Sequence, residues 1–145
     1  MNSWPKPFIP VLIDHDLPPL KIIDSSAGLI NFAESKEFRM YVCGITPYDA
    51  THLGHAATYL AFDLIYRYQS LSGRNVKFVE NITDVDDPLL ERANRDKLDW
   101  SELADSQINL FKSDMSALRV IPPDHFIKVT ESLSIIVLKV SLYMT

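Results

Sequence analysis

The sequence holds a single cysteine, Cys43, among 145 residues. One cysteine cannot form an internal disulfide, so the pattern of a disulfide-stabilised secreted scaffold is excluded. The chain also lacks an excess of basic residues, because its formal net charge is −5. A nonspecific nucleic-acid binder needs a basic face, so no nucleic-acid partner is expected. A small anion held by backbone groups stays compatible with this charge.

Long apolar runs are absent as well. No stretch approaches the roughly 20 apolar residues of a membrane span. The N-terminal MNSWPKPFIPVL has neither a basic region nor a long apolar region, which predicts no signal peptide. We therefore expect a cytoplasmic protein without a membrane partner. Its length suffices for one domain with a core.

The first 76 residues predict an arm, three strands and one helix. Residues 1–19 contain five of the nine prolines and predict an extended arm. Strands are expected at 20–24 and 29–32, around the turn SSAG, and at 38–43. From Gly54 the apolar residues recur at helical spacing up to Gly73, a natural stop. The apolar face predicted for this helix consists of Ala57, Leu60, Ala61, Leu64, Ile65, Tyr68 and Leu71.

The rest of the pattern predicts a strand and two helices. A strand is expected at 76–82 and helical structure at 84–96, with acidic residues at its N-terminal end. DWSE, residues 99–102, has the spacing of a helix N-terminus, and Pro122 ends the helix behind it. The apolar face of that helix is predicted to consist of Ala104, Ile108, Phe111, Met115 and Leu118.

This order of elements predicts an α/β fold. A strand–helix–strand unit of this length favours a parallel pair, which is half of a doubly wound sheet. Ligands of such sheets bind outside the carboxyl ends of the strands. Cys43 and Asn81 both fall at such ends, so the site is expected there.

Two histidines and a glycine lie at the start of the predicted helix 54–71, where residues 52–55 read HLGH. A helix N-terminus attracts phosphate, and Gly54 lets a ligand approach the backbone closely. His52 and His55, one turn apart, could donate hydrogen bonds to a phosphate whose charge grows during transfer. Two surface or helix-capping histidines are the other interpretation.

The remaining polar groups allow more than one role. Cys43 could be a metal ligand or a nucleophile, or a buried small hydrophobe. Asn81 and Thr83 could bind a ribose or an amino group. The acidic side chains that follow could hold an ammonium ion or Mg²⁺, or could cap a helix. These acidic residues are Asp84, Asp86 and Asp87.

Together, MYVCG, HLGH and NITDVDD resemble the N-terminal catalytic half of cysteinyl-tRNA synthetases, which are class I synthetases with a Rossmann-type domain. HLGH is similar to their ATP-binding signature, which usually has isoleucine at the second place. Those synthetases typically read CGPTVYD, HIGHART and DVDDKI, whereas this chain reads CGITPYDATHLGHAATY and DVDDPLLERA. With the proline-rich arm, residues 3–132 resemble more closely the mycothiol-pathway ligases of actinobacteria.

The resemblance implies an ATP-dependent, AMP-forming ligase. It would join L-cysteine to the amine of glucosaminyl-inositol (1D-myo-inositol 2-amino-2-deoxy-α-D-glucopyranoside). ATP would bind together with Mg²⁺. The cysteine carboxylate would attack the α-phosphorus of ATP and release pyrophosphate. The sugar amine would then attack cysteinyl-adenylate, forming an amide and releasing AMP. The resemblance does not determine the oligomeric state, and a monomer is among the possible states.

The resemblance also implies roles for individual residues. Cys43 would be one ligand of a Zn²⁺ that binds the thiolate of substrate cysteine, because zinc favours soft sulfur. His52 and His55 would stabilise the triphosphate. The positions implied to grip ATP or to line the adenylate are Gly44, Ile45, Thr46, Gly54, Thr58, Asn81, Ile82 and Thr83.

Enzymes of this family run well beyond 145 residues, and their further zinc ligands and KMSKS loop lie downstream. This chain has no second cysteine and no KMSKS-like string. Residues 20–132 are therefore expected to be the N-terminal part of the catalytic domain. Residues 133–145 are expected to be an atypical tail of a truncated or frameshifted product that is inactive alone. A cysteinyl-tRNA synthetase fragment and a noncatalytic nucleotide-binding remnant are the alternatives.

Overall fold

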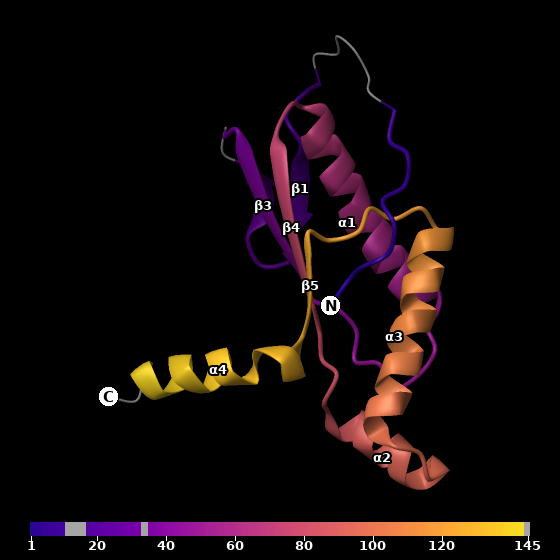
Figure 1. Ribbon diagram of the computed structural model, residues 1–145. Coiled ribbons are helices and arrows are strands. Elements are labelled where there is room, and N and C mark those ends of the chain that lie inside the picture. The colour runs from indigo at the N-terminus through magenta and orange to yellow at the C-terminus, as the bar shows by residue number, and fades with distance from the viewer. Residues whose placement is uncertain (11–16, 33–34, 144–145) are drawn as a thin grey trace.

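A three-stranded parallel sheet forms the centre of the chain, with the strand order β3–β4–β5. The computed structural model describes residues 1–10, 17–32 and 35–143. Residues 11–16 of the predicted arm and residues 144–145 of the predicted tail lie outside this description. Figure 1 shows the sheet between helices on one side and a projecting helix on the other. The strands of this sheet are β3 (Glu37–Val42), β4 (Asn75–Ile82) and β5 (His125–Lys128).

Helices connect the strands in the order expected of a doubly wound sheet. One helix joins β3 to β4, and two helices join β4 to β5, which confirms the predicted α/β fold class. β5 itself was not predicted, because its four residues are too few for a recognisable alternation. The helices are α1 (Leu53–Leu71), α2 (Asp87–Asp96), α3 (Trp100–Ala117) and α4 (Val129–Tyr143).

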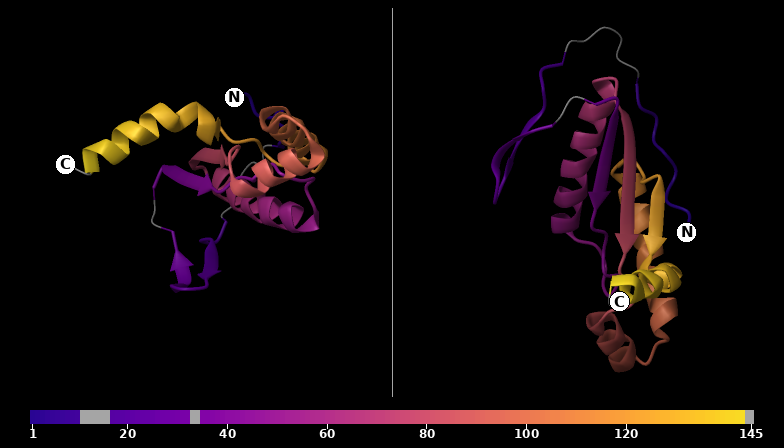
Figure 2. Two further views of the ribbon diagram at one scale, coloured as in Figure 1. Left: turned by 90° about the horizontal axis from the view of Figure 1, so that it is seen from below. Right: turned by 90° about the vertical axis from the view of Figure 1, so that its left-hand side faces the viewer.

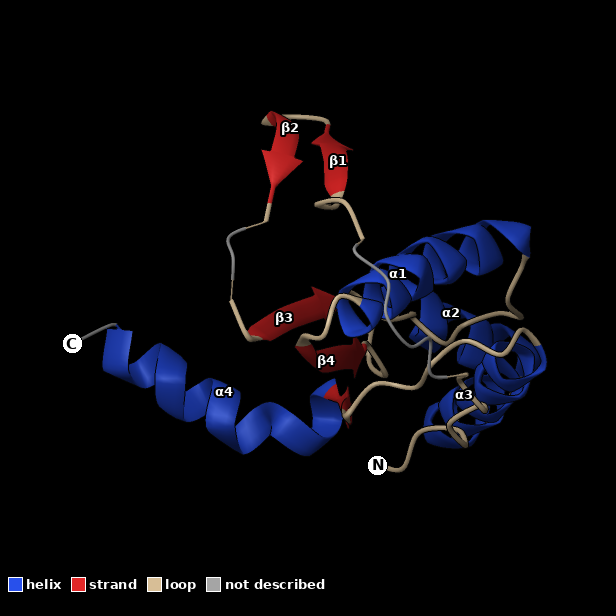
Figure 3. Ribbon diagram, turned by 90° about the horizontal axis from the view of Figure 1, so that it is seen from above, coloured by secondary structure: helices blue, strands red, loops and turns tan. Residues whose placement is uncertain are grey.

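The core lies between the sheet and the helices α1 and α3, which cover the same side of the sheet (Figures 1 and 3). Every second side chain of β4 is buried on this side. Phe111 of α3 is fully buried, its ring stacked on Phe126 of β5 and edge-on to Tyr59 of α1. These ring contacts hold the two helices to the sheet at one level.

The N-terminal arm contributes to this core. Trp4 is 5% exposed and packs edge-on against Phe111 and Phe126. Its indole N–H donates to the carbonyl oxygen of Val120 at 2.8 Å, so the polar atom of the buried ring has a partner. The arm is thus anchored to the core of the fold through Trp4.

A separate two-stranded hairpin precedes the sheet and stands away from it in Figures 2 and 3. It pairs β1 (Lys21–Asp24) with β2 (Gly28–Asn31) in antiparallel register. Asp24 closes the turn by accepting hydrogen bonds from the backbone N–H groups of Ser26 and Ala27, both at 2.8 Å. Gly28 has φ +71°, a conformation that favours glycine. The predicted strands and the turn SSAG are confirmed.

The apolar face predicted for α1 was mostly wrong, although Ile65 packs partly buried against the core and Tyr68 is half-buried. Leu64 is 68% exposed and Leu60 and Leu71 are also exposed. The face that meets the sheet carries larger amphipathic or polar side chains, namely Tyr59, Asp63, Tyr66 and Gln69. Asp63 tolerates burial because its carboxylate accepts from the backbone N–H of Ile121 at 2.8 Å and pairs with Arg67 at 2.6 Å. The predicted face of α3 is confirmed except for Leu118, which is exposed at the helix end.

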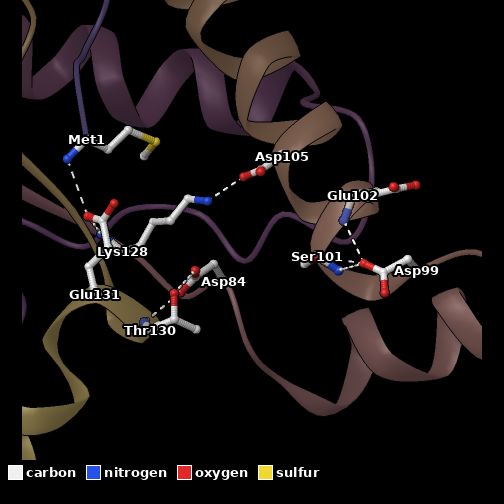
Figure 4. A network of polar contacts seen from close by, with 9 residues as sticks. All are labelled: Met1, Asp84, Asp99, Ser101, Glu102, Asp105, Lys128, Thr130 and Glu131. Atoms are coloured by element: carbon white, nitrogen blue, oxygen red, sulfur yellow. Dashed lines mark hydrogen bonds and ion pairs between the residues drawn. The ribbon is translucent and has the colours of Figure 1, made fainter.

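α4 projects from the body of the molecule, as the whole-chain views show (Figures 1, 2 and 3). None of its residues is buried. Its start is held by polar contacts drawn in Figure 4: Asp84 accepts from the backbone N–H of Thr130 at 3.0 Å, and Glu131 pairs with the α-amino group of Met1 at 3.3 Å. No helix in the described part of the chain is long and apolar enough to cross a membrane.

Candidate active site

The carboxyl ends of β3 and β4 meet at Gly44 and Asn81. A Cβ atom at Gly44 would lie 1.6 Å from the carbonyl oxygen of Asn81, so only glycine fits there. The Gly44 N–H donates to Oδ1 of Asn81 at 3.2 Å. Cys43, next to this contact, is exposed and free. Sequence reasoning expected Cys43 and Asn81 at neighbouring strand ends, and the parallel register of β3 and β4 brings these ends together.

The loop after β3 is tied to the end of β4 by a further backbone bond. The Thr83 N–H donates to the carbonyl oxygen of Ile45 at 3.0 Å. Ile45 is 4% exposed and Ile82 is fully buried, so their side chains belong to the core. Of these two expected lining residues, only backbone atoms can border a ligand. Thr46 and Thr83 are half-buried beside them.

His52 and His55 form a reciprocal cap at the start of α1. Nδ1 of His52 accepts from the Gly54 N–H at 3.0 Å, and Nδ1 of His55 accepts from the His52 N–H at 3.2 Å. Their ring centroids are 4.1 Å apart. The capping interpretation of HLGH is therefore confirmed, with histidines in the places that Ser and Glu usually take.

Each imidazole uses only one of its two ring nitrogens in this cap. Because Nδ1 accepts a hydrogen bond in both rings, the neutral tautomer carries its proton on Nε2, which is left as a donor. Burial lowers the pKa of His55 below its ordinary value, and the neighbouring His52 adds to this shift. His55 is thus held neutral near pH 7, so the pair can donate hydrogen bonds to an anion without requiring two charged rings.

The second turn of α1 is connected to the same region. The Tyr59 hydroxyl donates to the carbonyl oxygen of Cys43 at 3.3 Å. Thr58, expected to touch the adenylate, is exposed, and its hydroxyl donates to the carbonyl oxygen of Gly54 at 3.0 Å. α1 is thereby fixed against the end of β3, with Thr58 one turn from the histidine pair.

A hollow of about 440 Å³ opens beside the histidines, between the start of α1 and the end of α3. Thr51, just before HLGH, is hydrogen-bonded through its hydroxyl to the carboxylate of Asp114 in α3. His52, Leu53 and Ala56 contribute to the same hollow. α3 therefore positions the loop that carries His52.

The acidic residues after β4 act mainly as helix caps. Asp86 is the N-cap of α2 and accepts from the Asp87 N–H at 2.9 Å. Asp84, 3% exposed, accepts from both the backbone N–H and the hydroxyl of Thr130 at the start of α4 (Figure 4). Two of the three candidate ligands for an ammonium ion or Mg²⁺ are thus engaged in capping.

A zinc site is not assembled by the described residues. No group of three or more His, Cys, Asp or Glu side chains in this part of the chain could hold a metal ion. Zinc in proteins takes about four ligands. Cys43 offers one soft, exposed donor, so the chain by itself does not fit the metal that the resemblance implies.

A buried carboxyl group lies beneath the strand ends. Glu80 of β4 is fully buried between Val42 and Phe126, and neither of its oxygens has a hydrogen-bond partner among the described residues. Burial raises the pKa of Glu80 to about 8. Burial also raises the pKa of Tyr59, and the nearby Glu80 and Cys43 add to this shift. Glu80 is therefore protonated at neutral pH.

Sequence reasoning missed two tyrosines of this site. The Tyr41 hydroxyl donates to Oδ1 of Asn81 at 2.8 Å, and Tyr59 holds Cys43 as described. Tyr41 lies two residues before Cys43 in β3, and alternate residues of a strand share a face, so the pattern contained a signal for it. Tyr59 could be found only once α1 was placed.

A parallel sheet with a helix start and polar groups at its carboxyl ends is the arrangement expected of part of a class I synthetase catalytic domain, and comparison with known proteins identifies that class. The family model for the tRNA synthetases class I (C) catalytic domain matches residues 29–142. The chain belongs to this family. The match runs past Leu133, the predicted start of an atypical tail, and that boundary stays a prediction.

More particularly, the chain is similar to curated proteins named L-cysteine:1D-myo-inositol 2-amino-2-deoxy-α-D-glucopyranoside ligase. It is 54% identical to the one from Thermomonospora curvata, covering 94% of this chain and 34% of that protein. It is 56% identical to the one from Segniliparus rotundus, covering 94% and 33%. The chain thus spans about one third of the length of these relatives.

Solved structures support the fold. The Mycobacterium tuberculosis methionyl-tRNA synthetase in complex with methionyl-adenylate matches 66% of this chain and 19% of its own, with a TM-score of 0.60 and 27% identity. The Rossmann-type parallel sheet expected from the sequence is confirmed by this likeness and by the strand order β3–β4–β5.

Proposed function

We propose that this chain is the N-terminal part of an ATP-dependent ligase that joins L-cysteine to the amine of glucosaminyl-inositol through cysteinyl-adenylate. The observation that carries the proposal is the convergence of Cys43, Asn81 and the capped start of α1 at the strand ends. The 54% identity to a ligase of that name supports the choice of substrates.

The first half-reaction would take place between the helix start and the strand ends. Nε2–H of His52 and His55 would donate to phosphate oxygens as charge builds on them, and the α1 N-terminus adds its positive dipole end. Gly54 leaves room for the triphosphate because it has no side chain. The cysteine carboxylate would attack the α-phosphorus, forming cysteinyl-adenylate and releasing pyrophosphate.

The second half-reaction would use the same positions. The backbone around Gly44 and the polar groups of Asn81 and Thr83 would border the adenylate while the sugar amine attacks its carbonyl carbon. AMP leaves as the amide bond forms. Zinc, when bound, supplies affinity for the thiol of cysteine, and Cys43 would contribute one of its donors.

The test supplies the downstream part that the relatives have beyond the segment matched by this chain. The chain is fused to the downstream part of the Corynebacterium glutamicum ligase, of which it covers 33%, in place of that protein's matching segment. We expect cysteine-dependent exchange of pyrophosphate into ATP, and a cysteinyl amide with glucosaminyl-inositol detected by mass spectrometry. The purified 145-residue chain alone is expected to show no exchange, because it spans about one third of the length of these ligases, and exchange by it would contradict this expectation.

The acceptor distinguishes the alternatives. Charging of tRNA in place of the sugar amine would favour a cysteinyl-tRNA synthetase fragment. A folded fusion that binds ATP but exchanges no pyrophosphate would favour a noncatalytic nucleotide-binding remnant.

A further inference from the structure

The side-chain amide of Asn81 has a defined orientation. Its oxygen faces the backbone N–H of Gly44 at 3.2 Å, and a backbone N–H can only donate, so this atom must be Oδ1 rather than Nδ2. The Tyr41 hydroxyl donates to the same oxygen at 2.8 Å. An amide oxygen has two lone pairs, and both are therefore used.

The nitrogen of the same amide is consequently the group left for a ligand. Among the described residues, Nδ2 has one long contact, to the Thr83 hydroxyl at 3.4 Å. Asn81 is half-buried at the end of β4, where a doubly wound sheet binds its ligand. The side chain thus presents a donor, and its acceptor atom is already occupied.

Tyr41 is placed to maintain this orientation. Gly44 supplies its hydrogen bond from the backbone and cannot be varied without a clash, whereas Tyr41 supplies its bond from a side chain that is 62% exposed. A phenol so exposed contributes little to the core. Its hydrogen bond to Oδ1 of Asn81 is therefore the contribution of this side chain that can matter at the strand ends.

We propose that Tyr41 is a positioning residue, whose hydroxyl holds the Asn81 amide with Nδ2 towards the ligand, so that Asn81 donates to an oxygen acceptor of the adenylate. This inference rests on the proposed function for the identity of the ligand. It assigns a donor role to Asn81 and a role to Tyr41, which lies outside the HLGH and NIT segments.

The first measurement needs no ligand. In ¹H–¹⁵N spectra of the full chain, Tyr41→Phe should shift the Asn81 side-chain amide signals and leave those of the other asparagines in place. The unfolding midpoint should be nearly unchanged, because an exposed hydroxyl is removed. Tyr143→Phe, which removes a hydroxyl from a side chain that is 88% exposed, is the matched control. Unchanged Asn81 signals in Tyr41→Phe would overturn the positioning.

The second measurement uses the sulfamoyl analogue of cysteinyl-adenylate, titrated by calorimetry into the fusion with the downstream part of the Corynebacterium glutamicum ligase and into the variants of that fusion. We expect Tyr41→Phe to weaken binding about five- to tenfold, as expected for one misdirected hydrogen bond. Asn81→Asp, which keeps the acceptor oxygens and removes the donor, should weaken binding at least as much. In the double variant, Tyr41→Phe should reduce the affinity for the analogue no further than Asn81→Asp does alone.

The outcomes separate the two proposals. Additive losses in the double variant would overturn the inference, because Tyr41 would then act elsewhere. A wild-type fusion that binds no analogue would count against the proposed function and overturn the donor role of Asn81. The spectra without ligand decide the positioning in either case.

Discussion

At the scale of single residues, Glu80 makes the stability of the fold depend on pH. Its pKa is about 8 in the folded chain and near 4.5 when exposed. Between these values the folded chain holds a proton that the unfolded chain releases, so the free energy of unfolding falls as pH rises from 4.5 to 8. The slope from this group is at most about 1.4 kcal/mol per pH unit.

Glu80→Gln removes this titration and keeps the shape of the side chain. We expect the variant to gain stability over the wild type steadily between pH 5 and pH 8, measured by urea unfolding at several pH values. Glu91→Gln, at an exposed position of α2, is the control and should track the wild type. His55, whose pKa is lowered, acts in the opposite direction in both chains and cancels in the comparison. A Glu80→Gln difference that does not change with pH would contradict a raised pKa.

His52 combines two roles that one substitution separates. Aspartate is a good N-cap and favours the helix dipole, so His52→Asp should preserve the stability of α1. Its negative charge should repel phosphate, and NMR titration with ATP should show affinity reduced by about tenfold or more. His52→Ala loses the cap and should lower the free energy of unfolding by about 1 kcal/mol. Equal ATP affinity of wild type and His52→Asp would remove His52 from the phosphate site.

At the scale of elements, the arm stabilises the sheet through Trp4. Trp4→Ala should lower the free energy of unfolding by about 3–5 kcal/mol, since it empties a site between Phe111 and Phe126. Trp4→Phe should cost less, about 1–3 kcal/mol, because it mainly leaves the Val120 carbonyl without its donor.

Phe8 provides the matched arm residue, because it is 78% exposed. Phe8→Ala should change stability by less than about 0.5 kcal/mol in the same chemical unfolding experiment. Similar losses for Phe8→Ala and Trp4→Ala would mean that the arm acts through general contact rather than through the indole.

α1 shows where hydrophobic periodicity misleads. The pattern marked its leucines as the buried face, but Tyr59 and Asp63 are buried instead, and each places a polar atom against a partner. α3 carries its apolar residues on one face, with few large polar residues among them, and there the same reasoning succeeded. A count of apolar residues underestimates how often amphipathic side chains such as tyrosine are buried.

At the scale of the whole molecule, the exposed apolar surface of α4 should cause self-association. A helix that is apolar on all sides is normally covered. We expect the 145-residue chain to show a concentration-dependent mass in sedimentation experiments, and a chain ending at Ser132 to show a lower one. The exposed apolar side chains of α4 are Leu133, Ile135, Ile136, Val137, Leu138, Val140, Leu142 and Tyr143.

The shorter chain keeps the contacts that anchor the start of α4, those of Thr130 with Asp84 and of Glu131 with Met1. Its near-ultraviolet circular dichroism should therefore match that of the full chain. Identical sedimentation of the two chains would assign the association to another surface, such as the free edge of β3.

The overall α/β order could be read from the sequence because each long element carries its own periodic signal. The strand β5 and the pairing of Asn81 with Gly44 and Tyr41 could not, since both depend on segments far apart in the chain. The resemblance supplied the substrates and the zinc. The caps at His52 and Asp86 were among the alternatives that the spacing left open.

The α-amino group of Met1 lies 3.3 Å from the side-chain carboxylate of Glu131, so the beginning of the chain is held near the start of α4. Met1 and Ser132 therefore lie near one another in space, although they are at opposite ends of this part of the chain. A short glycine–serine linker from Ser132 to Met1, with new ends at the exposed turn Ser25–Ala27, would give a circular permutant that keeps the sheet β3–β4–β5. The arm would then become an internal connection, and Trp4 would enter the core from a tethered segment.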